Sequence, residues 1–436
     1  MEKILPKISI MKILLLGGGG RIHVFAWKIS QSPLCSQLYI APGNAGTAML
    51  GVNIDIDFMD FEAVKEVVIR EQIDFVIVGP EAPLVAGIVD YFQADPLLQK
   101  IPVLGPDQEA ALLEGSKTFA KDFMRRHGIP TARYMEVDTE NVEEGLRFLN
   151  SLNPPYVLKA DGLAFGKGVL IIDRLEEAHQ ELQMMLDGKF GEASKKVVIE
   201  EFLDGTEFSV FTLTDGSHFL LLPEAKDYKR IGDGDQGLNT GGMGSISPVP
   251  FFTGAFREKV KNKIILPTIA GLQKDKMHYT GFVFFGLIKV QNEPYVIEYN
   301  CRMGDPEAQS VIPRIEEDLL PALLNAAKMN LKEGSLKVSD RSACSIVAVS
   351  GGYPGDYERG KKITGIDQTE GLVFHAGTKM TEKGEILTNG GRVLAVTAIS
   401  EDPAQACVDA LRDIQKINYE GIFFRKDIGR DILEQP

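Results

Sequence analysis

The stretch YVLKADGLAFGKGVLIID, residues 156–173, sets glycines and lysines between two short apolar runs. The flanks YVLKA and VLIID are rich in β-branched residues and predict two short strands. The glycines then lie in the turn of an antiparallel hairpin. A P-loop is excluded, because only three residues separate Gly162 from Gly166 and Gly168 stands where a hydroxyl residue should follow the lysine.

A glycine-rich hairpin of this kind can act as a flap. Its backbone N–H groups can close over phosphate groups while a separate lysine supplies positive charge. The alternative is an ordinary glycine-rich hairpin with a purely structural role, and this motif by itself does not separate the two.

The chain before the hairpin alternates strand-like and helix-like segments from Met11 onward. This order predicts a doubly wound parallel sheet, in which the loops at residues 17–21, 41–46 and 79–84 share one rim. Ile22 replaces the last glycine of a dinucleotide fingerprint, so a nicotinamide cofactor is not expected. Arg21 and the first turn of the following helix favour an anion cradle, although the glycines could serve tight packing alone.

The length of 436 residues suits about three domains. We expect an N-terminal Rossmann-like domain over residues 1–111 and a central α+β domain over residues 112–331. Within the latter, a flap subdomain should occupy about residues 120–195. A helix should cover ALLEGSKTFAKDFMRRHG, at the start of this central region. Residues 332–436 predict a small α+β domain, and residues 1–10 read as an extension before Met11.

Composition points to small-molecule partners. The formal net charge of −14 disfavours nucleic acid and anionic membranes as main partners. The four cysteines are widely spaced without a C-x-x-C pair, which predicts a reducing cytoplasm and no disulfide framework or zinc site. No apolar run reaches the length of a bilayer span. We expect a monomer or a weak homodimer.

The segment VIEYNCRMGDPE, residues 296–307, is the candidate metal site. Glu298 and Asn300 lie two apart on a predicted strand and therefore on one face, where they offer oxygen ligands to Mg²⁺ or Mn²⁺. A surface-facing pair is the alternative, but the loop that follows places this face at the end of a sheet. Arg302 could bind a carboxylate or phosphoryl group there.

The stretch PEAKDYKRIGDGDQGLNTGGMGS, residues 223–245, is rich in turn-forming and charged residues, so we expect it outside the core as an active-site loop. Asp227, Lys229 and Arg230 could hold substrate or the γ-phosphate, with a solvated loop as the alternative. Most histidines are scattered and read as structural, and His23 is kept as a candidate because it adjoins Arg21 on the rim.

Ordered motifs along the chain resemble those of the glycinamide ribonucleotide synthetase family of ATP-grasp ligases. They are GGGGRIHVFAWK, APGNAGTA, VGPEAPL, EGSKTFAKDFMRRHGIPTA, KADGLAFGKGV, EEFLDGTEFSV, LNTGGMGS, VIEYNCRMGDPE, SGGYPGDYERGK, VFHAGTK, NGGRVLAVTA and FFRKDIG. The resemblance spans Met11 to about Leu433. It implies that ATP, glycine and 5-phosphoribosylamine give glycinamide ribonucleotide, ADP and phosphate through a glycyl phosphate, in purine biosynthesis.

The resemblance also implies roles for individual residues. The expected ATP-binding residues are Lys117, Lys159, Gly162, Gly166, Lys167, Gly168, Glu201, Phe202, Leu203 and Glu207. The expected catalytic residues are Arg302, Asp227 and Lys229, and the expected metal ligands are Glu298 and Asn300. The expected substrate-binding residues are Gly19, Gly20, Arg21, Gly43, Asn44, Glu81, Pro83, Asn239, Gly241 and Gly242.

Three positions depart from the family pattern, and two other functions remain open. Ile22 replaces a glutamate, Phe165 a small residue and Tyr228 a histidine, which affects the expected substrate contacts. An ATP-grasp ligase for another acid or amine would keep Lys117, Lys159 and Glu298 but not the rim loops. An ATP-binding regulatory protein would not need both lysines and the metal pair.

Overall fold

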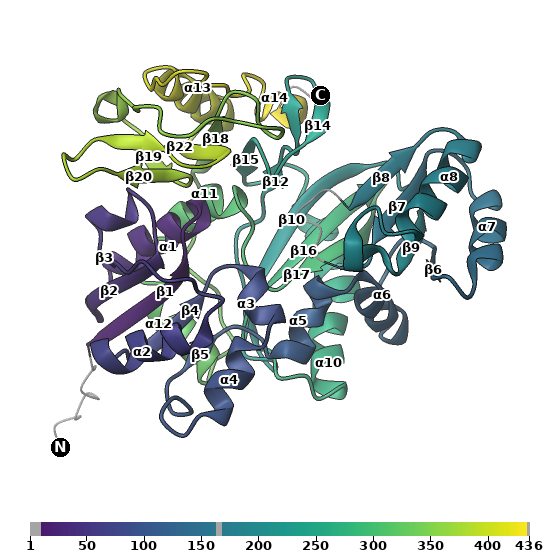
Figure 1. Ribbon diagram of the computed structural model, residues 1–436, viewed down its shortest axis with the longest axis horizontal. Coiled ribbons are helices and arrows are strands. Elements are labelled where there is room, and N and C mark those ends of the chain that lie inside the picture. The colour runs from purple at the N-terminus through teal and green to yellow at the C-terminus, as the bar shows by residue number, and fades with distance from the viewer. Residues whose placement is uncertain (1–9, 163–167, 434–436) are drawn as a thin grey trace.

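The computed structural model describes residues 10–162 and 168–433, so Phe165, Gly166 and Lys167 lie outside the described residues. Three regions surround a common centre in Figure 1: the N-terminal sheet, the central region with a projecting subdomain, and the C-terminal sheet above them. Within the described ranges, none of the helices is both long enough and apolar enough to cross a membrane.

The N-terminal region is the predicted doubly wound parallel sheet. Its strand order is β3-β2-β1-β4-β5, and all neighbours are parallel. The side chains of β1 alternate between two cores, with Leu14 and Leu16 in one and Ile13 and Leu15 in the other. A strand buried on both faces needs a continuous apolar run, which is what LLL supplies. The elements are β1 (Met11–Gly17), α1 (Gly20–Ser30), β2 (Cys35–Pro42), β3 (Val52–Asn53), α2 (Phe61–Glu71), β4 (Phe75–Val78), α3 (Glu81–Val85), α4 (Ile88–Ala94) and β5 (Val103–Leu104).

The predicted single helix over residues 111–128 is wrong. The structure has α5 (Gln108–Gly115) and α6 (Lys117–Arg126), separated by Ser116 in an extended conformation. The Ser116 hydroxyl accepts the Phe119 N–H as an N-cap and donates to the Asp161 carboxylate, which also accepts the Thr118 N–H at 2.7 Å. The break therefore places Lys117 in the first turn of α6.

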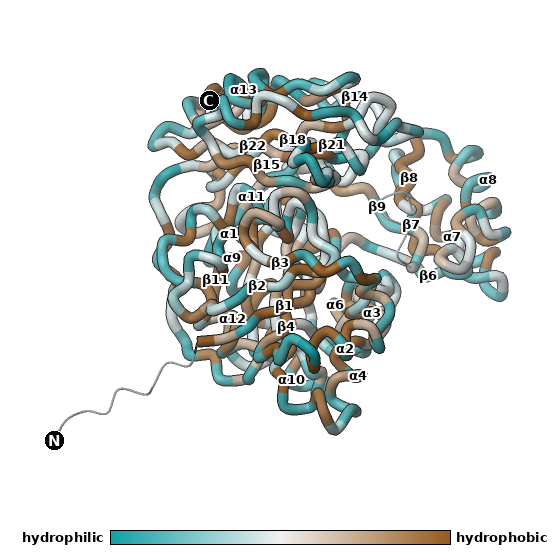
Figure 2. The backbone as a smooth tube through the Cα atoms, turned by 60° about the vertical axis from the view of Figure 1, so that its left-hand side comes forward, coloured by the Kyte–Doolittle hydropathy of each residue, from teal (hydrophilic) through white to brown (hydrophobic). Residues whose placement is uncertain are grey.

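The predicted hairpin is confirmed. β7 (Tyr156–Ala160) pairs antiparallel with β8 (Val169–Ile172), and Lys159 lies opposite Val169. The sheet has the order β6-β9-β7-β8 and buries its own core with two helices. These elements project to one side of the molecule in Figures 1 and 2. The others are β6 (Tyr134–Val137), α7 (Val142–Asn150), α8 (Leu175–Leu186) and β9 (Val197–Glu201).

A second antiparallel sheet carries the predicted metal pair. Its order is β11-β10-β16-β17, and β17 lies at one edge. The register between β16 and β17 shifts next to Gly286, which pairs with Glu298, so the strand is irregular at Ile297. The elements are β10 (Thr206–Thr214), β11 (Phe219–Leu221), α9 (Gly254–Val260), a π-helical turn (Lys261–Ile265), α10 (Leu266–Lys274), β16 (Gly281–Val290) and β17 (Glu293–Asn300).

The C-terminal sheet combines strands from both sides of the predicted boundary at residue 331. Its order is β12-β15-β18-β22-β19, so β12 and β15 reach it from the central region. α13 covers β18 and β22. The elements are β12 (Lys226–Asp227), β15 (Gly244–Ser247), β18 (Ser342–Val349), β19 (Leu372–His375), β22 (Arg392–Ser400) and α13 (Pro403–Ile414). Two small hairpins lie outside this sheet. One pairs β13 (Arg230–Gly232) with β14 (Gln236–Asn239), and the other pairs β20 (Thr378–Met380) with β21 (Ile386–Thr388).

The prediction that residues 223–245 lie wholly outside the core is wrong. Tyr228 is only 2% exposed and belongs to the C-terminal core, and all of β15 is buried. Turn-forming residues predicted a loop here, but the segment contains the short strands β12, β13 and β14 and the start of β15. Of these, β12 and β15 belong to the C-terminal sheet. The remaining helices are α11 (Glu307–Val311), α12 (Leu320–Ala327) and α14 (Arg430–Leu433), with 3₁₀ turns at Thr47–Met49, Gly191–Ser194, Ile312–Arg314 and Ile366–Gln368.

Candidate active site

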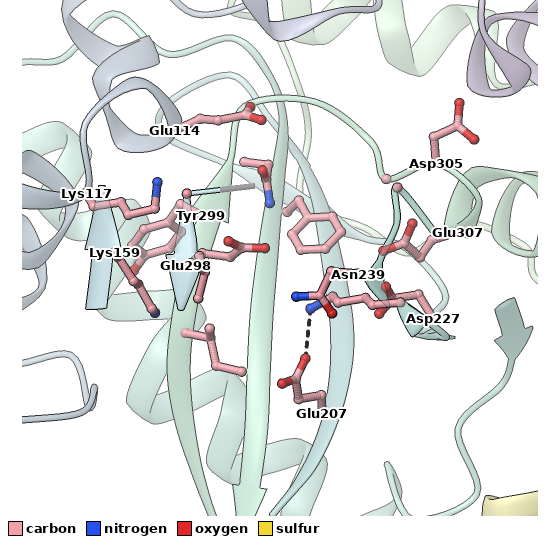
Figure 3. Close-up of a pocket in the computed structure, with 18 of the residues that line it drawn as sticks. Glu114, Lys117, Lys159, Glu207, Asp227, Asn239, Glu298, Tyr299, Asp305 and Glu307 are labelled. Atoms are coloured by element: carbon pink, nitrogen blue, oxygen red, sulfur yellow. Dashed lines mark hydrogen bonds and ion pairs between the residues drawn. The ribbon is translucent and has the colours of Figure 1, made fainter. Parts of the chain in front are cut away.

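A cleft of about 800 Å³ lies where the three regions meet. Its volume is within the range of pockets that enclose whole ligands. Many of the predicted site residues lie along it, and Figure 3 shows several of their side chains converging on the same space. Those in the lining are Arg21, Glu81, Lys117, Lys159, Gly162, Gly168, Glu207, Asp227, Lys229, Asn239, Gly241, Glu298, Asn300 and Arg302.

One side of the cleft, which we call the lysine wall, consists of Lys117, Lys121, Lys159 and Glu200. Glu200 is 4% exposed and its two oxygens lie 2.9 Å from Lys159 Nζ and 3.1 Å from Lys121 Nζ. Lys121 also donates to the Thr131 hydroxyl at 2.7 Å. Two ammonium groups thus share one buried carboxylate, and the Lys117 ammonium donates to the Gly162 carbonyl at 3.4 Å. The excess positive charge of this wall suits a polyphosphate.

The lysines and Glu200 influence one another's protonation. Burial raises the pKa of Glu200, but the adjacent Lys159 and Lys121 outweigh it and the net pKa is lowered. Burial lowers the pKa of Lys121 to about 8, although Glu200 opposes the shift. The pKa of Lys117 is also lowered, first by burial, while Glu298 acts to raise it. A bound anion would restore the charged form of both lysines.

The predicted hinge, residues 201–203, connects β9 to β10. The Glu201 carboxylate accepts the Arg133 N–H at 2.8 Å, so this side chain ties the end of β9 to the residue before β6. Phe202 is 39% exposed. Glu207 begins the face of β10 that lines the cleft, and its carboxylate lies 2.8 Å from Lys229 Nζ. That ammonium lowers the pKa of Glu207.

Glu298 and Asn300 form the candidate metal pair on β17. Asn300 is buried, and its side-chain oxygen accepts from Arg302 Nη2 at 3.2 Å. Across residues 10–162 and 168–433, no hydrogen bond or ion pair engages the Glu298 carboxylate, and no group of three His, Cys, Asp or Glu could hold a metal ion. One carboxylate and one amide oxygen fit Mg²⁺, which usually takes few protein ligands beside phosphate and water.

A second charged cluster of the lining, which we call the arginine wall, consists of Arg21, Arg302, Glu81 and Glu114. Arg302 lies 2.7 Å from Glu114 and 3.3 Å from Glu81, and Arg21 lies 3.8 Å from the same Glu81 oxygen. Burial lowers the pKa of Arg302, but Glu114 and Glu81 outweigh it and the net pKa is raised. Two guanidinium groups and two carboxylates compensate each other here.

Asp305 connects the arginine wall to the N-terminal rim. Its carboxylate accepts the Arg21 N–H at 3.0 Å, and Arg21 Nη1 donates to the Met303 carbonyl at 2.6 Å. Arg392, from β22, lies 3.5 Å from the Asp305 carboxylate. The loop after β17 therefore holds the first turn of α1, although the two segments are far apart in sequence.

Asp227 and Glu307 also line the cleft, and Figure 3 draws them close together, away from Lys117 and Glu114. Glu307 is 4% exposed, and burial, with the Asp227 charge second, raises its pKa to about 8. Burial also raises the pKa of Asp227, while Lys229 opposes the shift. The pair can therefore hold one proton near neutral pH.

Residues of the N-terminal rim divide between the cleft and its support. The Asn44 side chain is 6% exposed and donates to the Gly18 and His375 carbonyls, both at 2.9 Å. His23, kept as a candidate because it adjoins Arg21, is buried, accepts the His375 N–H and is not in the cleft lining. Gly19, Gly20, Gly43, Pro83 and Gly242 are not in the cleft lining described here, and neither are Glu201, Phe202 and Leu203.

Two of the three departures from the family pattern, Ile22 and Tyr228, lie within the described residues, and each has contacts that explain it. Ile22 is buried beneath the rim, where its side chain would meet any Cβ added at Gly17 or Gly79. The Tyr228 hydroxyl donates to Asp431 at 2.6 Å. Both residues support neighbouring loops through contacts of their own.

Sequence reasoning missed four charged residues that organise the cleft. They are Glu114, Glu200, Asp305 and Arg392. Each of them stands inside a sequence motif that was used for the resemblance. Charged residues are seldom buried without a partner, so a charged residue within such a motif could have been proposed as part of the site. Their partners come from distant segments and could not be assigned from spacing.

Comparison with known proteins gives matches along nearly the whole chain. Family models for phosphoribosylglycinamide synthetase match as the N domain over residues 11–114, the ATP-grasp (A) domain over residues 115–308 and the C domain over residues 343–431. The chain is 46% identical to a phosphoribosylamine–glycine ligase of Escherichia coli K12, over 98% of this chain and 99% of the relative. A Neisseria meningitidis serogroup B protein of the same name is 44% identical, over 96% and 99%.

Solved structures agree. The crystal structure of phosphoribosylamine–glycine ligase from Thermotoga maritima superposes with a TM-score of 0.82 at 35% identity, covering 96% of this chain and all of that one. A biotin carboxylase domain from Hydrogenobacter thermophilus, solved with MgADP and bicarbonate, gives a TM-score of 0.71 at 17% identity, covering 95% and 92%. The latter likeness concerns the fold alone.

Proposed function

Because the chain belongs to the phosphoribosylglycinamide synthetase family, it is an ATP-dependent, ADP-forming ligase of purine biosynthesis, and we propose how its cleft joins glycine to 5-phosphoribosylamine. The observation that carries the residue assignment is that both walls and the pair Glu298 and Asn300 line one cleft. One wall has excess positive charge and the other has paired arginines, so the two suit different parts of the reaction.

We assign ATP to the lysine wall. Lys117 and Lys159 bind its phosphates, the backbone of residues 201–203 binds adenine, and Glu207 accepts ribose hydroxyls. Glu298 and Asn300 would hold Mg²⁺ or Mn²⁺, which neutralises phosphate charge when bound. Gly162 and Gly168 flank the proposed phosphate-covering turn, whose Gly166 and Lys167 lie outside the described residues.

In the first step, a carboxylate oxygen of glycine attacks the γ-phosphorus of ATP. A new O–P bond forms, the bond to the β-phosphate oxygen breaks, and ADP and glycyl phosphate result. A carboxylate is a poor acyl donor, and phosphorylation gives it a leaving group. Arg302 and Lys229 position the carboxylate and the transferred group, so orientation and charge compensation provide most of the catalysis.

In the second step, the amine of 5-phosphoribosylamine attacks the acyl carbon. The C–N bond forms, the C–O bond to phosphate breaks, and the nitrogen loses one proton. Asp227 and Glu307 face this space, and we assign the proton to this pair. Glycinamide ribonucleotide and phosphate are the products.

We assign the phosphoribosyl group to the N-terminal rim. Arg21 and the N–H groups at the start of α1, together with Gly19 and Gly20, suit a phosphate. Glu81 and Asn239 line the cleft, and Gly43, Asn44, Pro83 and Gly242 shape the loops beside it. The support for this assignment is that Arg21 belongs both to the rim, through its place in the first turn of α1, and to the arginine wall, through its ion pair with Glu81 at 3.8 Å.

We also propose a cytoplasmic location and a monomer or weak homodimer. The four cysteines are free, which suits a reducing compartment. Sedimentation velocity over a range of concentrations will separate the two oligomeric states.

One assay tests the reaction. Phosphate release is measured with ATP, glycine and freshly made 5-phosphoribosylamine, and each component is left out in turn. Release should require glycine, and the nucleotide product should form only with all three present. Bicarbonate is the matched alternative acid, given the fold shared with biotin carboxylases. Release that proceeds without glycine, or equally well with bicarbonate, contradicts the proposal.

A further inference from the structure

The loop between β12 and β15, here called the cleft loop (residues 229–241), forms one edge of the active-site cleft. Lys229, Asp235 and Asn239 all line the cleft. Residues 233–239 are exposed, so the core does not hold the tip of this loop. Lys229, at one end of the loop, pairs with Glu207 of β10, whereas the contacts that hold the tip are made by the C-terminal region.

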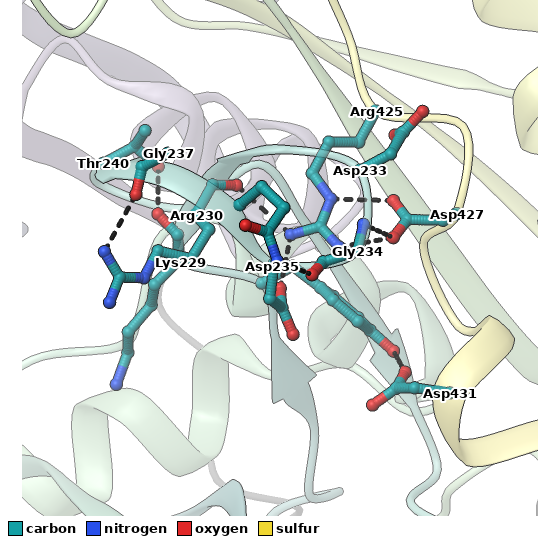
Figure 4. A network of polar contacts seen from close by, with 12 residues as sticks. Lys229, Arg230, Asp233, Gly234, Asp235, Gly237, Thr240, Arg425, Asp427 and Asp431 are labelled. Atoms are coloured by element: carbon teal, nitrogen blue, oxygen red, sulfur yellow. Dashed lines mark hydrogen bonds and ion pairs between the residues drawn. The ribbon is translucent and has the colours of Figure 1, made fainter.

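Arg425 makes the central contact. It is 1% exposed, and its Nη1 donates to Asp235 at 2.6 Å and to the Arg230 carbonyl at 3.2 Å. Its other nitrogens donate to both oxygens of Asp427, at 2.8 and 2.7 Å. Figure 4 shows the guanidinium between the cleft loop and residue 427. A planar five-donor group is required, because a lysine ammonium cannot make this set of bonds.

Backbone groups beside Arg425 strengthen the same attachment. The Gly234 N–H donates to Asp427 at 2.7 Å, and the Lys426 N–H donates to Asp233 at 2.8 Å. Burial raises the pKa of Asp427, but the hydrogen bond from Arg425 outweighs it and lowers the net pKa to about 2. Asp427 is therefore ionised at neutral pH, and its contact with Arg425 is a pairing of opposite charges.

The two ends of the cleft loop are held by the C-terminal region as well. Tyr228, just before the loop, donates to Asp431, and its ring lies 5.2 Å from the Arg425 guanidinium. At the other end, the Gly241 N–H donates to the Tyr353 hydroxyl at 3.0 Å, and Arg392 donates to the Gly241 carbonyl at 2.6 Å. The tip is thus held by Arg425 together with Asp427 and the Lys426 N–H.

We propose that Arg425 is a positioning residue that holds the cleft loop against the reacting groups and so couples ATP consumption to ligation. The inference rests on the proposed function. If the loop moves away, water can attack the acyl carbon of glycyl phosphate. A C–O bond to water then forms, the C–O bond to phosphate breaks, and the proton of water is released. Glycine and phosphate are regenerated, and ATP is spent without product.

The test is the ratio of phosphate released to glycinamide ribonucleotide formed, measured with all three substrates. Arg425→Met should raise this ratio severalfold and lower kcat for product about tenfold, while KM for ATP stays the same. Arg425→Lys keeps a charge and should give an intermediate ratio. Arg412→Met, on the exposed side of α13, is the matched control and should leave the ratio unchanged.

Two further variants separate positioning from general destabilisation. Ile414→Val, in the C-terminal core, should lower Tm without changing the ratio. Asp235→Asn removes the partner of Arg425 on the exposed loop and should raise the ratio even if Arg425→Met does not fold. An unchanged ratio in both the Asp235 and the Arg425 variants, or an equal rise in Ile414→Val, overturns the inference. Glycine-independent phosphate release by the wild type would instead overturn the proposed function.

Discussion

The lysine wall and the arginine wall face the same cleft but are built differently. The lysine wall comes from residues 117–200, where two ammonium groups pair with one buried carboxylate and the third, that of Lys117, adds a further positive charge. The arginine wall joins α1, α3, α5 and the loop after β17, with two guanidinium groups against two carboxylates. The first therefore attracts anions by its excess charge. The second is neutral as a unit and fixes geometry, and a substrate carboxylate must compete there with glutamates already in place.

The largest expected effect is that of Arg302→Met. It leaves Glu81 and Glu114 buried without their shared partner, which should cost about 3–5 kcal/mol of stability. It should also lower kcat/KM for glycine by about a thousandfold. Urea unfolding and steady-state kinetics measure the two effects, with Arg257→Met, an exposed residue of α9, as control. A loss of activity with unchanged stability would contradict the description of this wall as a self-compensated cluster.

Lys159→Met should show the opposite balance. Removal of one phosphate contact should lower kcat/KM for ATP about a hundredfold. The stability loss should be smaller than for Arg302→Met, because Glu200 keeps its ion pair with Lys121 at 3.1 Å. Exposed Lys328→Met serves as control. If Lys159→Met destabilises the fold as much as Arg302→Met, the two walls do not differ in the way described.

Lys121→Met tests whether the lysine wall acts as a unit. Lys121 does not need to touch ATP, but it shares Glu200 with Lys159. Without it, Glu200 should bind Lys159 more tightly, and the affinity for ATP should fall about tenfold, or about 1.4 kcal/mol. Isothermal titration with ADP measures this change. Equal affinities of Lys121→Met and the wild type would show that Lys159 acts independently.

The smallest effect concerns pH and Glu307. Its pKa is raised to about 8 in the folded protein, whereas an unfolded glutamate titrates near about 4.3. Between these values the folded state holds a proton that the unfolded state has lost, so stability falls as pH rises, by up to about 1.4 kcal/mol per pH unit. Glu307→Gln should remove this fall.

Urea unfolding of wild type and Glu307→Gln from about pH 5 to about pH 8 measures the difference. Curves that remain parallel over this interval would place the pKa of Glu307 near its ordinary value. In that case Glu307 would be ionised throughout, and the Asp227–Glu307 pair would not hold a proton near neutral pH before the amine attacks.

The features that could be predicted from the sequence are those set by local pattern. The β7–β8 hairpin followed from two β-branched runs around glycines, and the N-terminal sheet followed from alternating segments. The break at Ser116 could not be predicted, because the helical pattern continues across it and Asp161, which stabilises it, lies 45 residues away. Tyr228 was assigned to a loop because its core partners come from the end of the chain.

For the site too, residues within local motifs could be predicted, whereas contacts between distant segments could not. Lys117, Lys159 and Glu298 were found through motifs, and the structure brings them to one cleft. The partners that fix the arginine wall were missed, since Arg21 and Asp305 are separated by 284 positions. Spacing along the chain carries no information about such pairs.

The sharing of one sheet between the central and C-terminal regions has a consequence for biosynthesis. Because β15 pairs with β18 across a long stretch of chain, a nascent polypeptide presents β12 and β15 before their partner has left the ribosome. Arg425 is translated later still. We expect a chain that stops before Arg425 to contain every residue of the lysine wall but to lack the contacts that hold the tip of the cleft loop, so that ATP consumption becomes fully coupled to ligation only after this last segment has emerged.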